Sequence, residues 1–167
     1  MKMLRSAIEI DAPAARVWEV LTDLPAYPRW NPFIRRIAGA LTPGARLEVR
    51  LEPPGGSGIT LRPVVLAADR ERELRWRGSI LVPGLFDGEH HLILEPLAGG
   101  RVRFRQEERF SGILVPLLAR SLDRHTLGGF HAMNAALKER AEAPAAAPER
   151  AGEGAGASAP AAPATAI

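Results

Sequence analysis

The spacing of apolar residues changes to alternation near residue 33 and returns to helical spacing after Gly112, and these changes limit the folds open to the chain. Between residues 33 and 112 apolar and charged side chains alternate, as Leu47, Val49 and Leu51 do among arginines and glutamates. This alternation is typical of strands with one buried face. After Gly112 the apolar residues recur at helical spacing, at Leu114, Leu118, Leu122, Phe130, Met133 and Leu137. The pattern predicts an α+β fold, in which about six antiparallel strands precede one long helix that covers their apolar face.

Three further segments refine this prediction. Residues 3–10 are apolar-rich and predict a first strand, and residues 13–24 carry apolar side chains at helical spacing. Residues 59–67 predict another strand, although Pro63 lacks a backbone N–H and favours an edge or a bulge there. The pair Gly128–Gly129 interrupts the helical stripe and predicts a kink or the close approach of another segment.

Composition divides the chain into two parts. Residues 143–167 contain twelve Ala, four Pro and three Gly, and the terminal Ile167 is their only large apolar residue. Such a segment buries too little surface to offset the entropy lost on ordering. We therefore expect one folded domain over residues 1–142 and a disordered Ala/Pro/Gly-rich tail over residues 143–167.

Charge and the missing cysteines exclude several classes of protein. The 22 basic residues are nearly balanced by 19 acidic ones and alternate with them, which is typical of solvated strand faces. We therefore expect no nucleic-acid partner. Without cysteine the chain has no disulfide and no thiolate metal site. It has no run of 18 apolar residues and no signal-peptide pattern, so we expect a cytoplasmic protein without a transmembrane segment.

No motif for nucleotide, metal or nucleophilic chemistry is present in the sequence. His90 and His91 are adjacent in a predicted strand and point to opposite faces, so they do not form a simple metal-binding pair. His125 and His131 are six residues apart in the predicted helix and do not share a face. We expect neither a metal nor another cofactor.

Polar residues at apolar-face positions are the most informative feature for function. Gln106 and Glu108 share strand parity with Phe104 and Phe110, and His90 shares it with Leu92. His125 lies on the apolar stripe of the predicted helix. Two alternatives explain why polar side chains occupy these positions. Either a bulge turns them to solvent or an arginine pairs with them, or they line a cavity between the sheet and the helix. If a reaction occurs there, the candidates for general acid or base are Glu108, His90 and His125.

Aromatic residues near the expected cavity complete the candidate site. Tyr27 and Trp30 lie in a proline-bounded segment that is suited to the rim of a pocket, and the loop at residues 82–88 is either packed or a lid. The residues expected to bind a ligand are Tyr27, Trp30, Trp76, Phe86, His90, Leu92, Phe104, Gln106, Glu108, Leu118, Leu122 and His125.

Several runs of the sequence resemble a known superfamily. They are IEIDAPAARVWEVLTDLPAYPRWNPFI, LRWRG, GEHHLILEPL, RFRQEERFSGILVPLL and GFHAMNAALKERAE. They are similar to the START-related helix-grip (SRPBCC) superfamily, and most of all to its bacterial polyketide cyclase/dehydrase and lipid-transport group, over residues 2–142. The resemblance implies a curved, seven-stranded antiparallel sheet around a long C-terminal helix, with two short helices after the first strand. It also implies a deep hydrophobic cavity, but no catalytic motif.

Members of this superfamily bind lipids, sterols or aromatic polyketides, and a few catalyse cyclisation. The leading hypothesis is therefore a monomer or homodimer that binds a small hydrophobic molecule. One alternative is an enzyme of the cyclase/dehydratase type, and another is a stress or interaction protein with a vestigial cavity. A cavity smaller than roughly 300 Å³ would argue against ligand binding.

Overall fold

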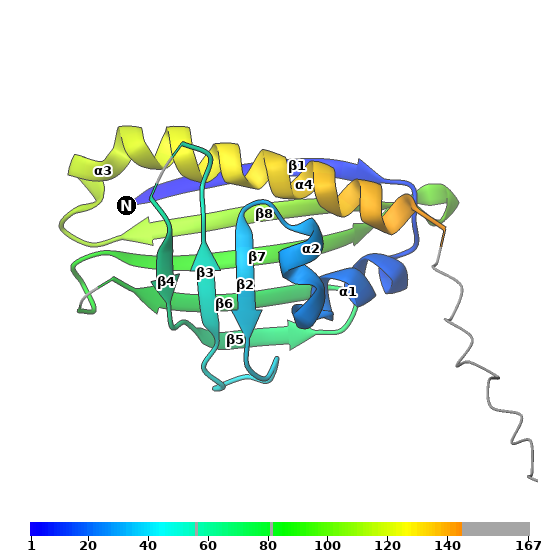
Figure 1. Cartoon of the computed structure of the whole chain (residues 1–167), viewed down its shortest axis with the longest axis horizontal. Helices are drawn as coiled ribbons and strands as arrows, with labels where there is room; N and C mark the ends of the chain where they lie inside the picture. Colours follow the sequence, from blue (N-terminus) through cyan, green and yellow to red (C-terminus); the bar gives the residue numbers. More distant parts are fainter. Residues whose placement is uncertain (56, 81, 145–167) are drawn as a thin grey trace, which may run out of the picture.

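The computed structural model describes residues 1–55, 57–80 and 82–144 of the chain. Apart from Ala143 and Pro144, the tail expected from composition lies outside the described residues. The structure has two antiparallel sheets, a pair of short helices and a long C-terminal helix (Figure 1). None of the described helices is both long enough and apolar enough to cross a membrane.

The larger sheet has five strands in the order β1-β8-β7-β6-β5. They are β1 (Lys2–Ile10), β5 (Val64–Asp69), β6 (Glu73–Ser79), β7 (Asp87–Pro96) and β8 (Val102–Ser111). The smaller sheet has the order β2-β3-β4, formed by β2 (Ile34–Ala38), β3 (Glu48–Leu51) and β4 (Ile59–Leu61). In Figure 1 the strands of the smaller sheet run across those of the larger one. The antiparallel arrangement expected from the sequence is confirmed.

The predicted single sheet of seven strands is wrong in number and division, because the run expected over residues 59–67 is split at Pro63. A proline cannot donate to a strand ladder, so β4 ends before it and β5 begins after it. Backbone bonds still link the two sheets at this bend, from the Leu47 N–H to the Pro63 carbonyl (2.9 Å) and from the Val65 N–H to the Ala45 carbonyl (2.9 Å). The two sheets are therefore joined at this bend, and the smaller sheet folds back across the larger one.

The two short helices after the first strand are present. They are α1 (Ala14–Thr22) and α2 (Tyr27–Trp30), joined by the single turn η1 (Leu24–Ala26). Val17 and Leu21 of α1 are fully buried, which explains the helical spacing of the apolar residues there. The helices lie at one end of the larger sheet, where β2 follows them (Figure 1).

The C-terminal helix is long but not uniform. It consists of α3 (Val115–Ser121), a π-helical segment η3 (Leu122–Thr126) and α4 (Leu127–Glu142). The irregularity expected at Gly128–Gly129 lies just before that pair. Gly129 instead provides the expected close approach, since a Cβ there would overlap the ring of Phe33.

The helical stripe divides into two functional halves. Phe130, Met133 and Leu137 of α4 are fully buried in the core, and α4 runs beside β1 (Figure 1). Leu118, by contrast, is 39% exposed, and Leu122 is only partly buried. The first half of the stripe is therefore less buried than the second, as the expected role of Leu118 and Leu122 in a cavity wall requires.

Candidate functional site

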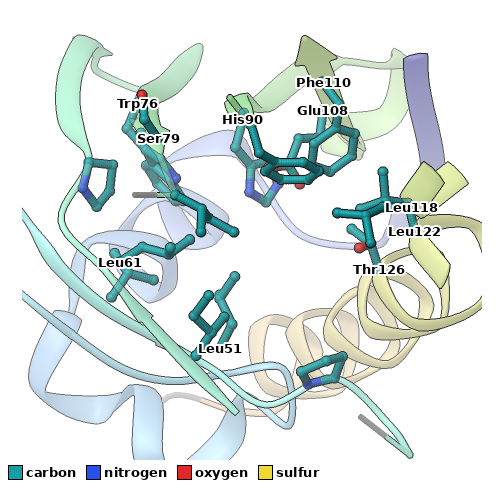
Figure 2. A pocket seen from close by; sticks show the side chains of 18 of the residues that line it. Leu51, Leu61, Trp76, Ser79, His90, Glu108, Phe110, Leu118, Leu122 and Thr126 are labelled. Atoms are coloured by element: carbon teal, nitrogen blue, oxygen red, sulfur yellow. The ribbon is translucent and has the colours of Figure 1, made fainter. Parts of the chain in front are cut away.

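A cavity of about 220 Å³ lies between the two sheets and the first half of the C-terminal helix. Figure 2 shows His90, Glu108 and Phe110 from the larger sheet on one side and Leu51 and Leu61 from the smaller sheet on the opposite side. Leu118, Leu122 and Thr126, spaced four residues apart, close a third side. The residues that line the cavity are Phe33, Val49, Leu51, Pro53, Ile59, Leu61, Pro63, Trp76, Gly78, Ser79, Ile80, Phe86, Gly88, His90, Glu108, Phe110, Leu118, Leu122 and Thr126.

Two strand glycines leave room for this space. A Cβ on Gly78 would lie 3.2 Å from the Pro63 side chain. A Cβ on Gly88 would lie 2.8 Å from Oε1 of Glu108 and 3.6 Å from the ring of Phe110. Glycine within a strand commonly marks such a close approach. Gly88 therefore permits the position of the Glu108 carboxyl.

Glu108 points into the cavity from β8. Its register is continuous with Leu4 on β1 and with His90 on β7, so the bulge considered as an alternative is absent. Its half-buried side chain lines the cavity, and burial raises the pKa of Glu108 to about 8. In the described part of the chain no arginine or other group pairs with its carboxyl. At neutral pH this group is mainly an uncharged acid that can both donate and accept a hydrogen bond.

His90 is held beside Glu108 by aromatic and polar contacts. Its ring stacks on Phe130, with centroids 5.0 Å apart, and meets Trp76 edge-on at 5.2 Å. Burial lowers the pKa of His90 to about 3, so the imidazole is neutral. Its Nε2 lies 3.1 Å from Oε1 of Gln106.

A buried amide network fixes which nitrogen of His90 carries the proton. The Gln106 amide donates to the Phe130 carbonyl (3.2 Å) and to Oδ1 of Asn134 (2.7 Å), and the Asn134 amide donates to Oγ of Ser6 (3.2 Å). Oε1 of Gln106 is then left as an acceptor, so Nε2 of His90 carries the proton and donates to it. Nδ1 is consequently the unprotonated nitrogen of the ring.

Half of the residues expected to bind a ligand lie in the cavity wall. These are Trp76, Phe86, His90, Glu108, Leu118 and Leu122. Leu92 and Phe104 are instead fully buried core, and Gln106 lies behind His90 in the amide network. The sequence predicted correctly that these three side chains point to the inner face of the sheet. The cavity, however, lies against only one end of the strands.

The other three expected residues lie away from the cavity. Tyr27 is fully buried and donates its hydroxyl to the Leu21 carbonyl (2.9 Å), and Trp30 packs on it at 5.0 Å between centroids. Nδ1 of His125 lies 3.0 Å from the Pro54 carbonyl oxygen, so this side chain turns toward the 53–55 turn. The π-helical segment, which the apolar spacing did not predict, contains His125. The expectation that His125 faces the cavity is wrong, and it leaves the set of catalytic candidates.

Most cavity residues that the sequence did not indicate come from the smaller sheet and its neighbours. Val49, Leu51, Ile59 and Leu61 were recognisable as one apolar face by their alternation. What spacing alone did not show is that β2–β4 fold across the larger sheet and aim this face at Glu108. The neighbouring glycines and Ser79 gave no signal of their own.

The cavity volume revises the expected ligand. At 220 Å³ it falls below the roughly 300 Å³ taken as a lower limit, which argues against the binding of a whole lipid, sterol or other drug-sized molecule. An apolar cavity of about 150 Å³ accommodates benzene. The space therefore suits a one- or two-ring molecule, or one part of a longer molecule that extends through the mouth. Within residues 1–55, 57–80 and 82–144, no three carboxylate or histidine groups converge as metal ligands.

Comparisons with solved structures agree with this architecture. A hypothetical protein of Helicobacter pylori, jhp0584, superposes with a TM-score of 0.70 at 20% identity, over 84% of this chain and 88% of that one. The ZhuI aromatase/cyclase of Streptomyces sp. R1128 gives 0.65 at 20% identity, over 84% and 93%. The di-domain aromatase/cyclase BexL of the BE-7585A biosynthetic pathway gives 0.65 at 17% identity, over 85% and 47%. At these identities the likeness shows the fold alone.

The sequence itself gives the family. No curated protein matches the chain. The family model described as polyketide cyclase/dehydrase and lipid transport matches residues 1–142, which include both sheets and the whole C-terminal helix. Together with the helix-grip architecture, this match shows that the chain belongs to the polyketide cyclase/dehydrase and lipid-transport family of the SRPBCC superfamily.

Proposed function

We propose that the protein binds a small, uncharged and mostly apolar molecule that carries one hydroxyl or carbonyl group. The observation that carries this proposal is the lone carboxyl of Glu108 in a cavity whose other walls are largely apolar. Binding sites for small molecules commonly combine apolar walls with a few polar groups that fix orientation. The family and its aromatase/cyclase neighbours support a hydrophobic ligand.

The charge state of the cavity favours a neutral ligand. The Glu108 carboxyl is mainly uncharged at pH 7, and His90 is neutral as well. Among the described residues no cationic side chain lines the cavity, so a ligand anion would be buried without compensation. A hydroxyl or carbonyl oxygen can instead accept the proton of the neutral carboxyl in a hydrogen bond.

Calorimetric titration with 1-naphthol tests this proposal. We expect saturable binding to the unmodified protein, because two rings match the volume of the cavity and one hydroxyl can pair with the carboxyl of Glu108. Leu61→Trp fills the cavity and should weaken binding at least tenfold. Leu97→Trp is the matched control, since Leu97 is half-buried outside the cavity wall, and it should leave binding unchanged. Equal affinities in the two variants would contradict the proposal.

The role of Glu108 has its own test within the same assay. Glu108→Gln keeps the shape and a hydrogen-bond donor, so binding should change less than about threefold. Glu108→Leu removes the polar group, and the loss of one net hydrogen bond of about 1 kcal/mol should weaken binding roughly fivefold. A Leu variant that binds as tightly as the wild type would remove Glu108 from the recognition of the ligand.

The environment of Glu108 also supports a second function, catalysis of a dehydration. A carboxyl with a pKa of about 8 is close to the operating pH, which favours general acid–base chemistry. As a carboxylate it would take the α proton of a β-hydroxy ketone and return a proton to the departing hydroxyl, which leaves as water. His90 is a poor base here because its pKa is about 3.

The racemic β-hydroxy ketone 4-hydroxy-4-phenylbutan-2-one is a suitable probe, since its dehydration product absorbs in the ultraviolet. If the protein is an enzyme of this type, turnover rises with pH up to about pH 8, following the ionisation of Glu108. Glu108→Gln should then abolish turnover and still bind 1-naphthol. Turnover that persists in this variant would exclude Glu108 as the catalytic group.

A further inference from the structure

The large apolar side chains that remain exposed are not scattered over the surface. In the part of the chain that the structure describes, six such residues are found, with exposures from 39% for Leu118 to 81% for Leu117. All six belong to segments at one end of the larger sheet. This group, called the apolar end below, consists of Met1, Met3, Val82, Ile113, Leu117 and Leu118.

Backbone and side-chain contacts hold these segments together. Lys2 of β1 is the register partner of Phe110 on β8, and its Nζ lies 2.8 Å from a carboxylate oxygen of Asp123. The Ile113 N–H donates to the Gly84 carbonyl at 3.2 Å, so the β6–β7 loop lies against the start of α3. Figure 1 shows the N-terminus, α3 and the β6–β7 connection at the same end of the molecule.

The charges around the apolar end are predominantly basic. Residues 1–3, 80–87 and 109–126 include four basic residues and two acidic ones. Both acids are engaged within the protein: Asp123 pairs with Lys2, and Asp87 accepts the Gly84 N–H at 2.9 Å.

Three exposed arginines, Arg109, Arg120 and Arg124, have no ion-pair partner within the described residues. Several other arginines of the larger sheet are matched by glutamates, as in the pair between Arg103 and Glu9 at 2.9 Å. Exposed arginines without an ion pair also occur elsewhere among the described residues, as at Arg72, but here three of them lie in the same segments as the exposed apolar side chains.

The cavity wall reaches the same end. Leu118 lines the cavity and is also a member of the apolar end. Ile80 and Phe86, which flank the loop that contains Val82, also line the cavity. The wall of the cavity and the apolar end therefore share the first half of the C-terminal helix.

We propose that the apolar end docks onto the surface of an anionic lipid bilayer. Ile113 and Leu117 are 74% and 81% exposed, which suits insertion at the boundary between headgroups and acyl chains. Arg109, Arg120 and Arg124 then lie at the level of the anionic headgroups. This arrangement needs no complementary groove on a partner, and it brings the cavity wall at Leu118 close to the bilayer.

Flotation with vesicles tests the proposal on the ligand-free protein, so it does not depend on the proposed function. We expect binding to vesicles of phosphatidylcholine mixed with phosphatidylglycerol, little binding to phosphatidylcholine alone, and weaker binding as salt is raised. The double variant Ile113→Asp/Leu117→Asp should lose at least about nine-tenths of the binding, and Arg120→Glu/Arg124→Glu should lose most of it.

Matched controls use the opposite end of the molecule. Ala98→Asp and Arg72→Glu change exposed residues in the turns at that end and should bind vesicles as the wild type does. Leu61→Trp, which fills the cavity, should also bind vesicles, and this separates docking from ligand binding. The proposal is overturned if the wild type does not float with anionic vesicles, or if the variants at the apolar end float equally well. It is also overturned if those variants instead dissociate a dimer of this chain or abolish capture of an acidic protein.

Discussion

At Glu108 and His90 burial moves two pKa values in opposite directions, and this has consequences for stability. The pKa of Glu108 rises from 4.5 to about 8, so the free energy of unfolding falls as pH rises through that interval. The pKa of His90 falls from 6.5 to about 3, so the free energy of unfolding falls as pH drops through that interval. These two residues together place the stability maximum between pH 4.5 and 6.5.

The first prediction is that Glu108→Gln removes much of the alkaline loss of stability. Urea unfolding of the wild type should show a slope of up to about 1.4 kcal/mol per pH unit between about pH 6 and 8. The Gln variant cannot ionise and should have a flatter profile over the same range. His90 and the exposed carboxylates are unchanged in the variant, so the acid side of the two profiles should coincide. Parallel alkaline slopes would show that the carboxyl of Glu108 ionises freely.

At the scale of elements the C-terminal helix has two different tasks, and stability measurements should separate them. Met133 lies in the fully buried half, where Met133→Ala leaves a void and should cost about 2–5 kcal/mol. Leu122 lines an existing cavity and is partly exposed, so Leu122→Ala should cost less than about 2 kcal/mol. Denaturant midpoints of the two variants give the comparison. Equal costs would mean that the cavity wall is packed as tightly as the core.

The glycine pair of the same helix provides a matched test. No atom lies within 4 Å of a Cβ built on Gly128, so Gly128→Ala should stabilise the protein by up to about 1 kcal/mol through helix propensity. A Cβ on Gly129 overlaps the Phe33 ring, so Gly129→Ala should destabilise the protein despite the same gain in propensity. Thermal unfolding should show midpoints that shift in opposite directions. Shifts of the same sign would mean that Phe33 moves aside at little cost.

At the scale of the whole molecule, the spacing of apolar residues along the sequence predicted the order of helices and strands and the face that each of them buries. The alternation in β8 placed Gln106 and Glu108 on the inner face correctly. It did not distinguish Gln106, which lies within an amide network, from Glu108, which faces an open space, because that difference depends on how far the cavity extends. Pro63, the π-helical segment and the fold of β2–β4 across the larger sheet set that extent. Pro63 is visible in the sequence, but the bend between the sheets at this residue, the π-helical segment and the fold of β2–β4 are products of tertiary packing rather than of local periodicity.

The domain boundary is the last feature that can be tested at this scale. The Ala143 N–H donates to the Glu139 carbonyl (3.1 Å) and closes the last turn of α4, so truncation after Pro144 leaves every described contact in place. We expect its melting temperature to stay within about 2 °C of that of the full chain, and a loss above about 5 °C would correspond to roughly 1 kcal/mol. Truncation after Ala141 is the contrasting variant. It removes Glu142, whose carboxylate accepts the Asp11 N–H at 2.6 Å and pairs with Lys138, and should therefore lower the melting temperature. Comparing the melting temperatures of the two truncated chains with that of the full chain thus locates the end of the cooperative unit. A large fall in melting temperature on removal of residues 145–167 would extend the domain beyond residue 142.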